Sequence, residues 1–270
     1  MVRKRIVNIL KKEWEVMFNN LNGILFVTLL PLLIVGQGFL YLWLAARFGQ
    51  EVILTSQMGQ TAIQHLVKVL PAMAALPAEA QLKVLLLNQF SFFLLLIPTM
   101  IAISFATFSI VDEKLSHSLE ALLATPVRTW ELLLGKALSG SLPAIVITWL
   151  CSLVFLLGVV GLGWSHLIGL VVTPSWYISL FLLTPAVAVL SFMLGIIGSS
   201  RAADPRGAQS IALVVILPVF ALIGVQVTGL VWFTPLLTLA LALGIGVVDI
   251  FVLRVATHLF QRESIVIRWR

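Results

Sequence analysis

The chain has 270 residues, of which 60% are hydrophobic and only 10% charged, and its formal net charge is +6 at pH 7. A soluble domain carries roughly 25% charged residues, so this composition excludes an ordinary soluble core and makes lipid the solvent. The basic residues flank apolar blocks instead of gathering with aromatic residues on a polar domain, which argues against nucleic acid as a partner.

Residues 2–20 place apolar and polar side chains on different faces of a helix. Apolar residues recur at three- and four-residue steps, whereas charged and amide side chains fall on another face. This pattern predicts an amphipathic helix along the inner membrane surface, with Arg5 and Lys12 on its polar side and Trp14 at the headgroup boundary. The alternative is an ordinary solvated helix.

Six apolar blocks follow, each long enough to cross the roughly 30 Å hydrocarbon layer as a helix. We expect a kink at Pro31 in the first block and a tight helical hairpin between the last two. The fold is therefore predicted to be all-α, a polytopic membrane protein forming a single transmembrane domain over residues 1–270. The six predicted transmembrane helices are 24–44, 84–111, 137–160, 176–198, 210–231 and 233–256.

Two connectors stand out by their polarity. Residues 45–83 are too polar to cross the bilayer and are interrupted twice by proline, which predicts the largest extracytoplasmic loop. Within it, residues 52–70 suit a short amphipathic helix on the outer leaflet. The segment 199–209, SSRAADPRGAQ, predicts a compact turn instead of a helix interior.

The distribution of basic residues orients the chain. Of the 17 Lys and Arg residues, 14 fall at the two ends and in the second and fourth connectors, and only 3 fall in the remaining loops. Basic residues collect in cytoplasmic segments, so these counts place both termini in the cytoplasm. The protein is predicted to be a multi-pass protein of the cell membrane.

The connector 112–136, between spans two and three, is longer than a simple turn requires, since such connections usually have about 4 to 6 residues. A short apolar edge beside one carboxylate predicts a helix that lies at the membrane surface and presents side chains to a partner. Thr125 and Pro126 then suit an N-cap and a first helical residue, so the expected pattern is helix, sharp break, helix. The edge consists of Leu119, Leu122 and Leu123, beside Glu120.

The connector reads LE-x-LL-x-TP and then EL-x-x-GK, and the tail contains FQRE. These patterns resemble the permease subunits of the type-2, export-type ABC transporter family, which are six-span membrane partners of separate ATP-binding subunits. Where that family commonly has Gly-Thr before Leu-Glu, this chain has His117 and Ser118, and Ser118 can still cap a helix. The matching residues are Leu119, Glu120, Leu122, Leu123, Thr125, Pro126, Glu131, Leu132, Gly135, Lys136 and the tail 260–263.

The resemblance implies that residues 113–125 form a coupling helix seated in a groove of a cytoplasmic ABC ATPase. That ATPase would bind ATP and Mg, and this chain would hold no cofactor of its own. A second permease subunit, identical or different, would face this one around the substrate path. The residues implied in ATPase coupling are Glu113, Ser118, Leu119, Glu120, Leu122, Leu123, Thr125 and Pro126.

The residues do not suggest an active site within this chain. The sequence has no glycine-rich loop ending in Gly-Lys-Ser/Thr and no arrangement typical of nucleophilic catalysis, so no catalytic residue is expected. His117 and Glu120 lack a second ligand pair, which argues against a metal site, and the lone Cys151 excludes an intrachain disulfide. Asp249 lies inside the last span, a little more than one turn before Arg254, which predicts a local ion pair.

We therefore expect the membrane-spanning permease subunit of a multi-subunit ABC exporter, which couples ATP hydrolysis by a separate subunit to movement of a substrate. Two alternatives stay open from the residues alone. The first is a non-transporting membrane anchor or assembly factor that docks a cytoplasmic protein. The second is a gradient-driven secondary carrier, whose transport would survive removal of ATP but fail when the proton gradient collapses.

Overall fold

The computed structural model of the chain is an α-helical bundle, and it describes residues 2–19, 21–115, 129–201, 205–228 and 231–259. The described residues contain no strand, and five of their helical segments are long and apolar enough to cross a membrane. The predicted all-α polytopic fold is confirmed. The five segments are Val27–Phe48, Ala78–Thr107, Thr129–Gly161, Pro174–Ser200 and Pro235–Leu259.

Eight long helices form most of the described structure, and short elements connect them. The long helices are α1 (Val2–Asn19), α2 (Leu21–Phe48), α5 (Ala78–Phe93), α6 (Leu96–Leu115), α8 (Thr129–Gly161), α11 (Thr184–Arg201), α12 (Pro205–Val227) and α13 (Pro235–Leu259). The short elements are α3 (Gln50–Thr55), α4 (Gln57–Val69), η1 (Pro71–Ala75), η2 (Ser165–Leu167), α9 (Ile168–Val171), α10 (Pro174–Ile178) and the π-helical η3 (Ser179–Leu183).

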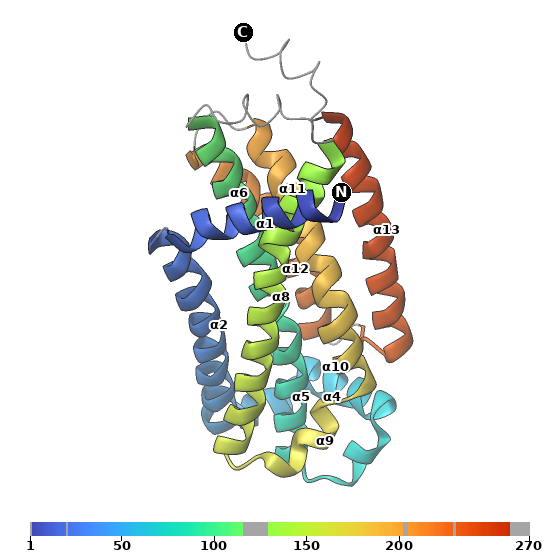
Figure 1. Ribbon diagram of the computed structural model, residues 1–270. Helices are drawn as coiled ribbons and strands as arrows, with labels where there is room; N and C mark the ends of the chain where they lie inside the picture. The colour runs from blue at the N-terminus through green and yellow to red at the C-terminus, as the bar shows by residue number, and fades with distance from the viewer. Residues whose placement is uncertain (1, 20, 116–128, 202–204, 229–230, 260–270) are drawn as a thin grey trace.

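The bundle has two distinct ends (Figure 1). Helix α1 lies across the long helices near one end, while α4, α9 and α10 gather at the opposite end. We call these the α1 end and the far end. Helices α2 and α13 lie at the two sides of this view, and both expose many large apolar side chains. In a membrane protein such apolar surfaces face lipid. A helix can lie in lipid because its backbone hydrogen bonds are satisfied within the helix.

The centre of the bundle is the contact between α6 and α11. Ala106 of α6 and Phe192 and Ile196 of α11 are almost fully buried. Gly195 permits the close approach of the two helices, because a Cβ at this position would lie only 2.7 Å from the Cβ of Ala106. Small residues at such contacts let membrane helices pack by van der Waals forces.

The second predicted span, 84–111, is two helices instead of one. Helix α5 begins earlier than predicted, at Ala78, and the chain breaks at residues 94–95 before α6. Pro98 explains the break, because it has no N–H to offer the carbonyl of Leu94 and its ring crowds that carbonyl. The N–H of Ile97 instead donates to the Leu94 oxygen, three residues back, at 3.2 Å. By contrast, α2 stays helical through Pro31.

The predicted amphipathic helix at 52–70 is divided at Ser56 into α3 and α4. The Ser56 hydroxyl caps α4 by accepting a hydrogen bond from the Gly59 N–H at 3.1 Å. The apolar face of α4 is buried in the main core of the bundle, with Leu66 1% exposed. That face is used for packing against protein and not for resting on the outer leaflet.

Helix α8 is longer than the predicted span 137–160, because it begins at Thr129 and includes part of the predicted connector. It ends in a turn in which Gly163 adopts a φ of +77°, a left-handed conformation that favours glycine. The π-helical η3 follows farther on, immediately before Thr184 and Pro185. Pro185 cannot donate to the preceding turn, and a π segment accommodates that gap.

The prediction of a turn over residues 199–209 is wrong at both ends, because both ends of this segment are helical. Helix α11 continues to Arg201, and α12 already begins at Pro205, so only residues 202–204 lie between them. Proline is well suited to a first helical position, because its fixed φ is helical and its missing N–H would have no partner there. Within α12 the described apolar stretch is Ile216–Gln226, shorter than a span, so the six-span count stays a prediction.

Candidate functional site

Helix α1 docks across the first turns of α8 at the α1 end (Figure 1). Gly135 lies at the crossing, where a Cβ would be 3.0 Å from the Cγ2 of Ile9. The glycine therefore leaves room for the backbone of α8 beneath α1. Three polar contacts surround this crossing, and each joins residues more than 120 positions apart in the chain.

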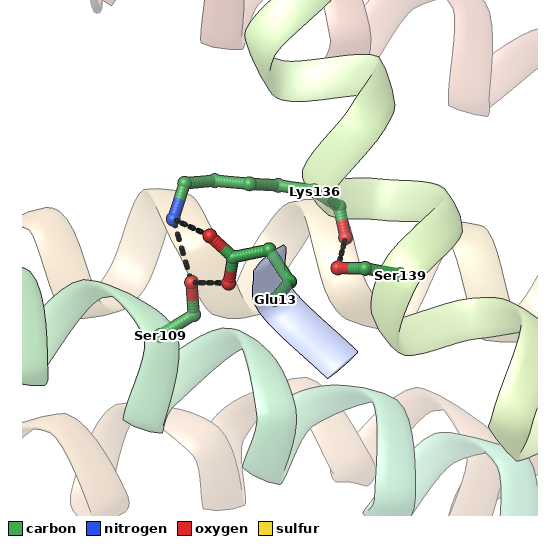
Figure 2. Close-up of polar contacts among 4 residues, drawn as sticks. All are labelled: Glu13, Ser109, Lys136 and Ser139. Atoms are coloured by element: carbon green, nitrogen blue, oxygen red, sulfur yellow. Dashed lines mark hydrogen bonds and ion pairs between the residues drawn. The ribbon is translucent and has the colours of Figure 1, made fainter. Parts of the chain in front are cut away.

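The central contact is a buried network among Glu13 of α1, Ser109 of α6 and Lys136 of α8 (Figure 2). The Lys136 Nζ lies 3.1 Å from Glu13 Oε1 and donates to Ser109 Oγ at 2.6 Å. Ser109 in turn donates to Glu13 Oε2 at 2.8 Å. The side chains of Lys136 and Glu13 are 2% and 13% exposed, so the two charges neutralise each other away from water.

Two further polar contacts hold the docked helix, one near its first turns and one beside Glu13. Arg5 Nη1 lies 3.4 Å from Glu131 Oε2, and Glu131 is almost fully buried in the first turn of α8. The Trp14 indole N–H donates to the Ser139 carbonyl at 2.8 Å. The Arg5 side chain is 40% exposed, so solvent screening weakens that ion pair relative to the Lys136 network.

The face of α1 that packs on the bundle includes Ile9 and Trp14 of the predicted apolar face and adds two charged residues to it. Arg5 and Glu13 lie on the docked side, and the Trp14 indole uses its polar group on the protein and not on lipid headgroups. Lys12 is exposed, as are Lys4 and Lys11. The sequence pattern missed these two charge pairs because the opposite charges are supplied by α8, far along the chain.

The three contacts brace both flanks of the predicted coupling region. Ser109 lies in α6 shortly before that helix ends at Leu115, and Glu131 and Lys136 lie in the first turns of α8. The segment 116–128 runs between these two helices in the chain. Glu113 belongs to the last turn of α6. The other predicted coupling residues lie outside the described residues: Ser118, Leu119, Glu120, Leu122, Leu123, Thr125 and Pro126.

Sequence reasoning singled out Arg5, Trp14 and Lys136 but missed Glu13, Ser109 and Ser139 as parts of one cluster. One signal was available for Glu13, a carboxylate one turn from Ile9 on the otherwise apolar side of an amphipathic helix. Its partner was also visible as a lysine at the start of a long apolar block. The pairing of the two needed the crossing angle of α1 and α8.

The predicted ion pair between Asp249 and Arg254 is not formed. Both residues are described, yet Asp249 Oδ1 is buried without a hydrogen-bond partner and Arg254 is exposed. Five positions along a helix correspond to about 500°, so the two side chains leave α13 in different directions. Among the described residues, no group of three or more His, Cys, Asp or Glu side chains gathers into a metal site.

A family model described as "ABC-2 family transporter protein" matches residues 7–260, nearly the whole chain. None of the curated proteins and none of the solved structures compared with the chain is significantly similar to it. The match covers the docked helix from residue 7 onward, both flanks of the connector and the helices of the bundle.

Proposed function

The chain belongs to the ABC-2 transporter family, and we propose that it is the permease subunit of a multi-subunit ABC exporter. Family membership makes it a membrane component of an ABC transporter and implies an ABC ATPase as partner. In the proposal, this ATPase is a separate cytoplasmic subunit that binds ATP and Mg. A second permease subunit, identical or different, completes the pathway for the substrate.

One observation carries the coupling part of the proposal: α1 is joined to α6 and to α8 on either side of the segment 116–128. Closure of two ATPase subunits would push on residues 113–125, which we propose form the coupling helix. Because both flanking helices share the Glu13 network, the push would move α6, α8 and α1 together. The central contact of α6 with α11 then passes the movement into the bundle.

The proposed orientation places the α1 end of the bundle and both termini in the cytoplasm of a cell membrane. The exposed side of α1 supports this, because Lys4, Lys11 and Lys12 face outward there, as expected beside anionic headgroups of the inner leaflet. The same end carries the connector that the ATPase would meet.

The test is a charge and polarity change within the proposed coupling helix, Glu120→Arg with Leu123→Asp, in the full-length chain expressed in its native host. We expect the variant to insert into the membrane but to lose the copurifying ATPase and its ATP hydrolysis, because the apolar edge and the carboxylate would both be gone. The matched control is Glu51→Arg with Val52→Asp at the start of α3, where both side chains are exposed. The control is expected to keep the ATPase.

Two outcomes would contradict the proposal. Retention of the ATPase by the Glu120 and Leu123 variant would remove the coupling role from this segment. Recovery of the unaltered chain without any nucleotide-hydrolysing subunit would instead favour a membrane anchor or a carrier. Transport that persists without ATP and stops when the proton gradient is collapsed would identify the carrier.

A further inference from the structure

A pocket of about 140 Å³ is lined in part by residues of α4, α9 and α10, and by none of the residues that dock α1. Its walls come from elements distant in the sequence: α4, α5, α8, the α10 and η3 segment, and the turn between α12 and α13. The π-helical η3 supplies Ser179 and Leu180 to the wall. Such π segments are frequent at functional sites because they displace side chains from the regular helical positions.

Three buried polar atoms in the pocket wall have no hydrogen-bond partner in the protein. They are the Ser152 hydroxyl oxygen on α8, the Gln226 amide oxygen near the end of α12 and the Trp232 indole nitrogen. Ser152 is 1%, Gln226 2% and Trp232 9% exposed. A buried polar atom without a partner is destabilising, so three of them around one pocket indicate that something else satisfies them.

The chemistry of these atoms defines what fits. The Gln226 oxygen accepts a hydrogen bond, the Trp232 nitrogen donates one, and the Ser152 hydroxyl can do either. Aromatic and aliphatic side chains, among them Phe92 and Phe233 stacked at 4.9 Å between ring centroids, form much of the remaining wall. None of the described residues that line the pocket is charged. A charged group entering it would therefore remain unpaired.

We propose that this pocket binds an uncharged amphiphilic molecule that presents a hydroxyl or amide group to Ser152, Gln226 and Trp232 and an apolar part to the aromatic wall. This inference rests on the proposed function, and it names the class of substrate that the exporter carries. The pocket discriminates by charge, because only a neutral polar group can satisfy the three atoms without leaving a bare charge in an apolar wall.

The proposal can be tested by cysteine protection with three nearly isosteric probes, neutral benzamide, anionic benzoate and cationic benzamidinium. Ser91→Cys, on the α5 wall of the pocket, is introduced into the full-length chain in native membrane vesicles, with the buried Cys151 replaced by alanine. The rate of modification by neutral methyl methanethiosulfonate is measured with and without each probe. Benzamide at about ten times its dissociation constant should slow the modification about tenfold, and the two charged probes should not.

The matched control is Ser165→Cys, an exposed position in η2 at the same end of the molecule but outside the pocket. Its modification should be insensitive to all three probes. Ser179→Cys, on the η3 wall, repeats the measurement from a second position should Ser91→Cys disturb the fold. Equal protection by all three probes, protection of Ser165→Cys, or no protection at either wall position would overturn the proposal. The last result would describe a pocket that holds only water.

A second variant separates a binding role from a structural one. Gln226→Leu removes an unpaired polar atom from an apolar wall, so we expect the thermal midpoint to stay unchanged or rise. Protection of Ser91→Cys by benzamide should nevertheless be lost. A lowered midpoint with protection intact would assign Gln226 to the fold alone and would contradict its role in binding.

These measurements need no ATPase. The proposed binding site and the proposed exporter function can therefore be contradicted independently of each other. Benzamide protection in a chain that recovers no ATPase would keep the site and reject the exporter. Copurification of the ATPase without any protection would keep the exporter and reject the pocket as its neutral-substrate site.

Discussion

Glu13→Ala is expected to destabilise the protein by about 3 kcal/mol, because it removes the carboxylate that pairs with the buried Lys136 ammonium and accepts a hydrogen bond from Ser109. The contact of Lys136 Nζ with the Ser109 hydroxyl oxygen would remain. The free energy of unfolding can be measured by titration with sodium dodecyl sulfate in mixed micelles, followed by circular dichroism. Helix α1 should also become accessible to proteolysis, since the network attaches it to both α6 and α8.

The double variant Glu13→Leu with Lys136→Met should recover most of the lost stability, because two apolar side chains of similar size replace a buried pair that carries its own desolvation cost. Lys11→Ala is the matched control, a charge removed from the exposed side of the same helix. Its effect should stay within about 0.5 kcal/mol. An equal loss in Glu13→Ala and Lys11→Ala would show that the pair is not buried in the membrane.

Gly195→Leu is expected to cost about 3 kcal/mol or more, because it forces α6 and α11 apart at the centre of the bundle. Even a Cβ would lie 2.7 Å from Ala106 Cβ and 3.4 Å from Ile103 Cα, and no flexible side-chain end lies there to move aside. The same detergent titration measures the effect. In the proposed mechanism this contact passes movement from α6 to α11, so ATP hydrolysis by the assembled transporter should also fall.

Two further variants identify the cause of that loss. Gly195→Ala with Ala106→Gly moves the methyl group to the other helix and should restore most of the stability lost in Gly195→Ala alone. Gly244→Leu on α13 is the matched control, because a Cβ there meets nothing within 4 Å. It should be neutral or slightly stabilising, since leucine favours a helix more than glycine does. A comparable loss at Gly244 would attribute the effect to glycine in any span and not to the contact.

The pattern of apolar and polar residues predicted the helical class, the membrane as solvent and the amphipathic character of α1. These properties are local, because each depends on hydrophobic length or on the 3.6-residue period of one segment. The prolines were harder to interpret. Pro98 breaks a helix, Pro31 lies within one and Pro205 begins one, and the outcome depends on which neighbours can satisfy the freed backbone groups.

The sequence by itself determined that this is a multi-spanning helical protein, and it contained the motifs of its family. Both properties are local, because the length of an apolar block and the residues of a short motif belong to one continuous segment of the chain. The tertiary structure decided that α1 docks on α8, that Lys136 pairs with Glu13, and that Asp249 does not pair with Arg254. It also brought Ser152, Gln226 and Trp232 to one pocket. The physical reason is that these contacts depend on how helices cross, and residues more than 100 positions apart supply the opposing charges.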